Sequence, residues 1–201
     1  DELIQVMRDS QKICRHLHLP LQSGSTRILE KMNRRYTREQ YVELALKIRS
    51  EIPDIAITTD IIVGFPGETP EDLEETIDVV RTVKFDNAFT FIYSKRTGTP
   101  AASMEDQVSE EQVKEGFDRL LKVVQDTARE QAAGHVGSIG EALIEEVNRD
   151  DDGAQSCQSL VTGRLSNNMI VHVPGDASLI GKTVRVSLDE CKGFYYMGTI
   201  L

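Results

Sequence analysis

Apolar residues in the first two thirds of the chain recur with two different periods, which predict alternating strands and helices. Mostly apolar runs at 55–63 and 88–93 are typical of parallel strands, and 16–22 alternates at period two like a shorter strand. Apolar residues three and four positions apart predict three helices, at 37–52, 69–83 and 109–131. This order predicts an α/β unit with a parallel three-stranded sheet and right-handed connections.

Three strands cannot close a barrel, so half of a larger barrel and a small open sheet remain as alternatives. In either case we expect the strand at 55–63 to be covered on both faces, by helices or by a barrel lumen. Residues 1–9 have the spacing of an amphipathic helix, but no capping residue precedes it. We therefore expect the chain to be part of a longer protein.

Beyond residue 134 the pattern changes to short β-like runs separated by glycine, asparagine and aspartate turns. The five runs are 142–147, 160–165, 169–173, 183–188 and 195–201. Five strands in so few residues predict a small barrel, joined to the first domain by the helix at 109–131. We therefore expect two domains, 1–133 and 134–201, and the acidic stretch Asp150 to Gly153 is expected to be a solvated turn.

The stretch 58–69, TTDIIVGFPGET, combines the end of a strand with a glycine turn and the start of a helix. Gly64 and Gly67 end the apolar run, and Thr69 supplies an N-cap before a helix-opening proline. Ligands of parallel α/β folds bind at such carboxyl strand ends, where backbone without Cβ lets a flat group approach. A purely structural turn is the alternative.

The charge of the chain limits its partners. Its formal net charge is −10, so it lacks the basic field that attracts proteins to nucleic acids or anionic membranes. Any RNA contact must be local, because the tail from residue 133 has five Lys and Arg against nine Asp and Glu. No apolar run has membrane-spanning length, and the first residues lack the features of a signal peptide. We therefore expect a cytoplasmic protein without a membrane partner.

Four motifs resemble those of radical S-adenosylmethionine (SAM) methylthiotransferases: HLPLQSGS at 18–25, NRRYTREQY at 33–41, TTDIIVGFPGET at 58–69 and GTPAA at 98–102. The tail is similar to the TRAM domain of that family, a β-barrel associated with RNA binding, through TGR at 162–164, PGD at 174–176 and LIGK at 179–182. The resemblance covers nearly the whole chain. It implies the carboxyl-terminal half of an open (β/α)6 radical SAM barrel, strands four to six, followed by the TRAM barrel.

The resemblance also implies two [4Fe–4S] clusters in the longer protein. In the family, one is held by a C-x-x-x-C-x-x-C loop in the first half of the barrel and the other by three cysteines of an amino-terminal domain. The cysteines of this chain, Cys14, Cys157 and Cys191, are far apart and form no such motif. We therefore expect the chain to hold no cluster and to be inactive alone.

The strand ends are implied to bind SAM. Gln22 and Ser23 would hydrogen-bond the methionine or ribose portion, and Ile62, Gly64 and Phe65 would lie along the adenine.

Asp60 interrupts an apolar strand, where a carboxylate is costly to bury without a partner. It either faces the lumen and contacts SAM or forms an ion pair with a neighbouring helix. His16 and His18 share one face of the first strand. We expect them to be packed, hydrogen-bonded residues and not metal ligands, because no third ligand shares their spacing.

Two groups of basic residues are candidates for binding the substrate. Lys95 and Arg96 follow the third strand and would bind a tRNA phosphate or the SAM carboxylate, with a solvated loop as the alternative. In the tail, a local RNA-binding patch would have to be formed by basic and aromatic residues, so we expect weak RNA affinity. These residues are Arg164, Lys182, Arg185, Lys192, Phe194, Tyr195 and Tyr196.

The leading hypothesis is that the longer protein adds a 2-methylthio group to N6-isopentenyladenosine next to the anticodon. We expect it to act as a monomer and to bind the anticodon stem-loop of tRNA. Methylthiotransferases that act on threonylcarbamoyladenosine in tRNA or on a ribosomal protein are alternatives. The ribosomal enzyme is disfavoured, since it has a histidine where this chain has Ser23. A non-catalytic RNA-binding module is the alternative from another class.

Overall fold

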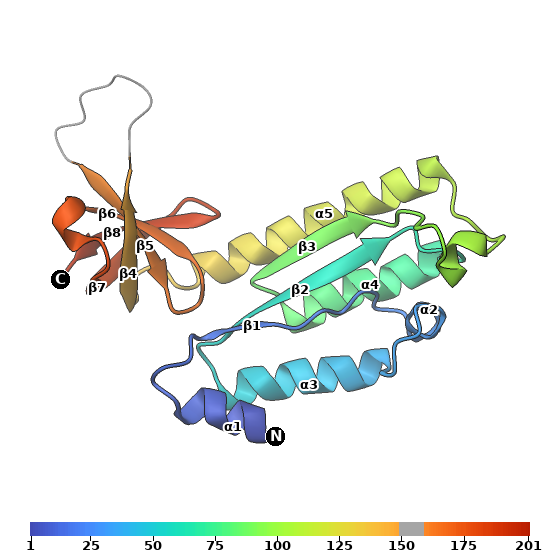
Figure 1. Cartoon of the computed structure of the whole chain (residues 1–201), viewed down its shortest axis with the longest axis horizontal. Helices are drawn as coiled ribbons and strands as arrows, with labels where there is room; N and C mark the ends of the chain where they lie inside the picture. The colour runs from blue at the N-terminus through green and yellow to red at the C-terminus, as the bar shows by residue number, and fades with distance from the viewer. Residues whose placement is uncertain (149–158) are drawn as a thin grey trace. The chain divides into compact units, whose positions relative to one another are not determined.

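The computed structural model describes residues 1–148 and 159–201 and divides the chain into two compact units (Figure 1). The first unit comprises Asp1–Arg8 and Leu17–Ala128, and the second comprises Asp9–His16 and Arg129–Leu201. The acidic stretch at 150–153 and Cys157 lie outside the described residues.

The first unit contains the parallel sheet expected from the apolar pattern. Its strands are β1 (His16–His18), β2 (Ala56–Val63) and β3 (Asn87–Ile92), in the order β1-β2-β3. Five helices accompany them: α1 (Glu2–Asp9), α2 (Thr26–Lys31), α3 (Arg38–Glu51), α4 (Pro70–Val83) and α5 (Glu110–Ala133). A 3-10 turn, Pro100–Ser103, follows the loop after β3. Each strand therefore ends in a loop at the same edge of the sheet (Figure 1).

The helices that flank β2 begin where their caps predict. Thr37 and Thr69 each accept a hydrogen bond from the backbone N–H three residues later, and a side chain at that later position returns one. Pro70 then opens α4 at the position where its missing N–H costs nothing. These two capping boxes fix where α3 and α4 begin, and therefore where the loops that precede them end.

One face of the sheet forms the core. Ile57, Ile61 and Val63 of β2 are at most 2% exposed and pack in a cluster with apolar residues of α3, α4 and α5. The opposite face is open, because Phe89 and Phe91 of β3 are about half exposed, at 51% and 52%. The helices of this chain therefore cover one face of the sheet, and cover of the second face of β2, by helices or by a barrel lumen, stays a prediction. Three strands supply nothing to cover the second face.

The second unit contains the small barrel expected from the tail. Its strands are β4 (Ile139–Val147), β5 (Leu160–Leu165), β6 (Ile170–Pro174), β7 (Thr183–Cys191) and β8 (Tyr195–Ile200). They close in the order β4-β5-β6-β8-β7, with β6 and β8 parallel and every other pair antiparallel. A 3-10 turn, Ala177–Leu179, precedes β7. Tyr196 fills the interior and donates a hydrogen bond from its hydroxyl to the Ala132 carbonyl at 2.9 Å.

Candidate functional site

A cavity of about 730 Å³ lies at the carboxyl ends of the strands of the first unit. Residues from four places line it: Gln22 after β1, the ends of β2 and β3, the end of α2 with the loop that follows it, and the loop at 94–101. Parallel α/β proteins bind ligands at this edge of the sheet. The volume suits a small organic molecule or a single nucleotide.

Gln22 continues the pairing of β1 with β2 up to the edge of the cavity. Its backbone N–H donates to the Asp60 carbonyl at 2.8 Å, and its own carbonyl accepts from the Ile62 N–H at 2.9 Å. The residue has a positive φ of 69°, which is uncommon for a residue with a Cβ. The backbone is thus held in a left-handed conformation where the Gln22 side chain reaches the cavity.

Asp60 lies on the open face of the sheet and also lines the cavity. Its carboxylate is 3.3 Å from Nε2 of His18 on β1, and Nδ1 of the same ring is 3.0 Å from the Thr58 hydroxyl. The ring also meets Phe89 edge to face. Of the two alternatives for Asp60, the ion pair with a helix is not formed among the described residues; its partner is a strand histidine.

Apolar and aromatic side chains form another wall of the cavity. Ile62 lies near the end of β2 on the open face of the sheet, and Phe65 follows the Gly64 turn. The Phe65 and Tyr93 rings meet edge to face, with centroids 5.2 Å apart. Such a wall offers flat contact area to a planar ring.

Basic side chains outnumber acidic ones around the cavity. Lys31, Arg34 and Arg96 line it, whereas Asp60 is the one acidic residue among the lining residues. Lys31 pairs with Asp106 at 2.6 Å. Arg34 and Arg96 have no ion pair in the parts of the chain that the structure describes. They are available to an anionic group of a ligand.

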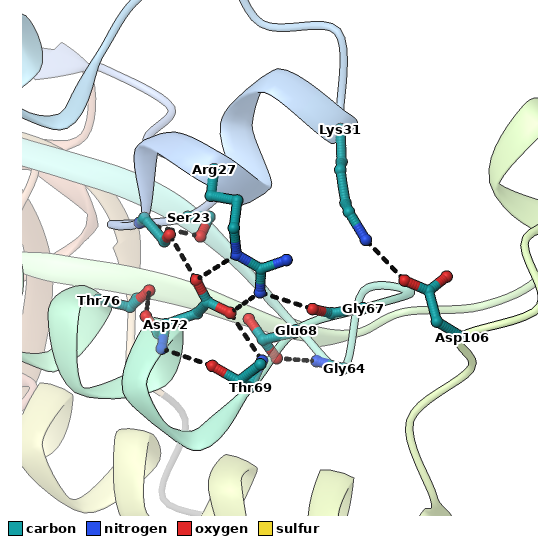
Figure 2. A network of polar contacts seen from close by, with 11 residues as sticks. Ser23, Arg27, Lys31, Gly64, Gly67, Glu68, Thr69, Asp72, Thr76 and Asp106 are labelled. Atoms are coloured by element: carbon teal, nitrogen blue, oxygen red, sulfur yellow. Dashed lines mark hydrogen bonds and ion pairs between the residues drawn. The ribbon is translucent and has the colours of Figure 1, made fainter.

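A buried polar network fixes the turn that follows β2 (Figure 2). Asp72 of α4 accepts hydrogen bonds from Ser25 Oγ at 2.6 Å, from the Thr69 N–H at 2.7 Å, and from Arg27. Arg27 also donates to the Gly67 carbonyl at 2.7 Å. Burial raises the pKa of Asp72, but the hydrogen bonds from Ser25, Arg27 and Thr69 together hold it below its ordinary value. Asp72 is therefore an ionised anchor for the turn.

Glu68 lies in the same turn, but its pKa is shifted in the opposite direction from that of Asp72. Its carboxylate accepts from the Gly64 N–H at 2.5 Å (Figure 2). Burial nevertheless raises the pKa of Glu68 to about 7, because the one hydrogen bond does not compensate for the loss of water. Gly64 has a φ of +78°, and a Cβ there would lie 2.6 Å from a Val113 methyl. Glycine is thus required at this position for both conformation and space.

Of the six residues expected to bind SAM, four line the cavity: Gln22, Asp60, Ile62 and Phe65. The other two lie elsewhere. Ser23 is fully buried and accepts from the Ser25 N–H at 3.2 Å, while Gly64 is occupied with Glu68. Neither residue is among those that line the cavity.

The two basic residues after β3, Lys95 and Arg96, line different hollows. Arg96 lines the cavity, whereas Lys95 lines a neighbouring hollow formed by residues 97–103. Arg34 and Tyr93 are among the lining residues that were not candidates from the sequence. The signals existed, because Arg34 lies in the NRRYTREQY motif and Tyr93 ends the apolar run of the third strand.

Two of the barrel cations proposed for RNA binding are paired with carboxylates. Arg164 binds Glu145 through two hydrogen bonds of 2.8 and 2.9 Å, and Lys192 lies 2.5 Å from Glu190. The hydrogen bonds that Arg164 donates to Glu145 raise the pKa of Arg164. Lys182 is exposed, with no ion pair among residues 1–148 and 159–201. A positive patch made of all three residues is therefore partly neutralised within the barrel.

The residues that the structure describes do not suit a metal cluster. No three His, Cys, Asp or Glu side chains among them are placed to hold a metal ion. Cys14 is exposed and Cys191 is half-buried, both as free thiols. An iron–sulfur cluster needs converging thiolates, which these two residues do not supply. Within the same described ranges, no helix is both long and apolar enough to cross a membrane.

Comparisons with known proteins agree with this architecture. Residues 1–80 match the radical SAM superfamily and residues 135–201 match the TRAM domain. The chain is 54% identical over 201 residues to the tRNA-2-methylthio-N(6)-dimethylallyladenosine synthase of Lachnoclostridium phytofermentans and 52% identical to that of Acetivibrio thermocellus. Each match covers the whole chain but only 43% and 41% of the relative.

A solved structure supports the fold. Coproporphyrinogen III oxidase from Escherichia coli, described as a radical SAM enzyme, matches with a TM-score of 0.53 and 14% identity. The match covers 98% of this chain and 48% of that one. The chain therefore combines a segment similar to the radical SAM superfamily with one similar to the TRAM domain, and it spans less than half the length of the curated relatives it matches.

Proposed function

We propose that the chain is the carboxyl-terminal part of a tRNA methylthiotransferase, which adds a 2-methylthio group to N6-isopentenyladenosine next to the anticodon. The synthases of L. phytofermentans and A. thermocellus carry this activity in their names and match the chain from end to end. The observation that carries the proposal is the cavity at the carboxyl ends of three parallel strands, beside an open aromatic sheet face.

The open face also supports the domain assignment. Residues 1–133 form the second half of an open six-stranded (β/α) barrel, with β1 to β3 as its fourth to sixth strands. Phe89, Phe91 and the Asp60–His18 pair then face the lumen of the complete barrel, which explains aromatic exposure of this extent. Residues 134–201 form the TRAM domain.

The cavity fits SAM by the chemistry of its walls. Arg34 and Arg96 suit the carboxylate of its methionine part, and Gln22 and Asp60 offer polar groups for its ammonium and ribose hydroxyls. The wall that contains Phe65 suits the adenine. SAM supplies the methyl group and, with a reduced cluster, the radical that attacks a C–H bond. The residues of this chain bind it, orient it and exclude water from it.

The described residues do not fit a [4Fe–4S] cluster, so we assign both clusters to parts of the longer protein beyond this chain. The chain alone is then inactive. Its partner is the anticodon stem-loop of tRNA, bound by the complete protein as a cytoplasmic monomer. The barrel contributes modest affinity, because Arg164 and Lys192 already have acidic partners.

A chimaera tests the proposal. This chain replaces the matching segment of the L. phytofermentans synthase, and the product is expressed in a host that lacks its own enzyme. We expect 2-methylthio-isopentenyladenosine in the host tRNA by nucleoside mass spectrometry, and none with the chain alone.

A folded but inactive chimaera that still binds tRNA would favour the non-catalytic RNA-binding module. Methylthiolated threonylcarbamoyladenosine, or a methylthiolated ribosomal protein, would instead identify one of the other two substrates. Each of these results would overturn the proposed substrate.

A further inference from the structure

Tyr93 lies at the carboxyl end of β3, on the open face of the sheet. Register pairs Asp60 with Phe89 and Ile62 with Phe91, so these four residues share that face. Tyr93 continues the alternation two residues after Phe91, and its backbone N–H donates to the Val63 carbonyl at 2.8 Å. The residue lines the cavity where the lumen face meets the strand ends.

The hydroxyl of Tyr93 is buried and has no hydrogen-bond partner. It is the one side-chain polar atom in this condition in the described parts of the chain. Tyr36, Tyr41 and Tyr196 donate their hydroxyls to the carbonyls of Leu21, Leu19 and Ala132. A buried hydroxyl without a partner is costly, and native proteins retain few such groups without a reason.

The Tyr93 ring is held in place by its neighbour. Phe65 meets it edge to face at 5.2 Å and 69°, the geometry preferred by aromatic pairs. Tyrosine has only two side-chain torsions, so a packed ring fixes the position of its hydroxyl. The hydroxyl is therefore already desolvated and fixed in position in the free protein. A ligand that forms a hydrogen bond with it does not have to offset the loss of water or of side-chain freedom.

We propose that the Tyr93 hydroxyl hydrogen-bonds an adenine ring bound in the cavity and selects for that base. The inference rests on the proposed function and adds a base-recognition group to it. Adenine offers ring-nitrogen acceptors and an exocyclic N–H donor, and a phenol hydroxyl serves either. The flat wall formed by Ile62, Phe65 and Phe91 suits the face of the same ring.

Adenine reaches such a cavity from two sources, the cofactor and the target nucleoside. The two are distinguished by titrating the 201-residue chain with S-adenosylhomocysteine in one arm and with an anticodon stem-loop RNA that contains isopentenyladenosine in the other. Tyr93→Phe is expected to weaken binding about three- to tenfold in one arm, the loss of one neutral hydrogen bond. The affected arm identifies the source.

Tyr41→Phe is the matched control, because it removes the same atom from a hydroxyl that already has a partner. Without ligand, Tyr41→Phe should lower the melting temperature, whereas Tyr93→Phe should leave it unchanged or raise it. Tyr41→Phe should leave ligand affinity unchanged at temperatures where it is folded.

Two results would overturn the inference. If the unaltered chain binds a ligand and Tyr93→Phe binds each ligand as tightly as the unaltered chain does, the base-recognition role is wrong while the proposed function stands. If the unaltered chain binds neither ligand at millimolar concentration, the assignment of the cavity and the role of Tyr93 fall together. An equal loss of stability in the two variants would also count against Tyr93, because it would reveal a structural partner for its hydroxyl.

Discussion

The Asp60 carboxylate lies 3.3 Å from Nε2 of His18, its partner on the neighbouring strand. Both residues belong to the open face of the sheet, and both side chains are about one third exposed. A polar pair with this exposure contributes little to stability. Its position at the cavity therefore points to a role in placing a ligand, which can be separated from a structural role by experiment.

Asp60→Asn in the chimaera should keep the fold while methylthiolation falls by about a hundredfold, the scale of losing one positioned polar group. Product is measured by nucleoside mass spectrometry and stability by thermal melting. His18→Gln serves as the companion variant, since it removes the partner but leaves the carboxylate in place. Wild-type turnover of Asp60→Asn at an unchanged melting temperature would remove Asp60 from the site.

The sequence predicted the strands and several residues of the cavity because both depend on local patterns. Period-two alternation placed His16 and His18 on one face of the first strand, and the glycine turn placed Ile62 and Phe65 at a strand end. The partner of Asp60 could not be predicted, because it depends on the register between β1 and β2. That register is set by tertiary packing and by the left-handed conformation of Gln22.

The pairing of Arg164 shows the same limit in the barrel. Register pairs Ile144 with Gly163 and Glu146 with Thr162, so Glu145 is an extra residue in β4, a β-bulge. The carboxylate of this extra residue binds Arg164. The bulge has no signature in the sequence, which therefore predicted Arg164 to be a cation available to RNA.

Asp72→Asn should destabilise the first unit by about 2 kcal/mol. The substitution leaves Arg27 without its counter-charge, and one of the new amide N–H groups faces the donors of Ser25 and Thr69. Urea unfolding of the chain measures the change. Glu71→Gln, an exposed position in the same helical turn, should have a much smaller effect. Equal effects of the two variants would show that the buried network contributes nothing beyond the helix dipole.

Glu68 should make the stability of the first unit depend on pH. Burial raises its folded pKa to about 7, above its ordinary value of 4.5, so the folded state binds the proton more tightly than the unfolded state. The resulting stability is fully present below pH 4.5 and is lost as the pH rises to about 7, by up to about 3 kcal/mol.

Glu68→Gln isolates this effect, because glutamine keeps an oxygen for the Gly64 N–H and cannot ionise. The difference in unfolding free energy between the variant and the wild type should grow in favour of the variant from pH 5 to pH 8. Urea unfolding across this range measures it. Parallel pH profiles would mean that Glu68 is already ionised in the fold at pH 5.

The acidic partners of the barrel's cations should limit its affinity for tRNA. Arg164 is held by Glu145 and Lys192 by Glu190, whereas Lys182 has no ion pair among the described residues. Lys182→Ala should therefore weaken tRNA binding by the full chain more than Lys192→Ala does.

Glu145→Gln should strengthen tRNA binding about threefold, because it frees the guanidinium of Arg164 for a phosphate. The slope of log affinity against log salt concentration should become steeper by roughly one, since one more phosphate is neutralised. Binding is measured by fluorescence anisotropy at several salt concentrations, with Glu141→Gln, an exposed carboxylate of the same strand, as the control for a simple change in net charge. An equal gain from both glutamine variants would show that overall charge, and not the release of Arg164, determines the affinity of the barrel for RNA.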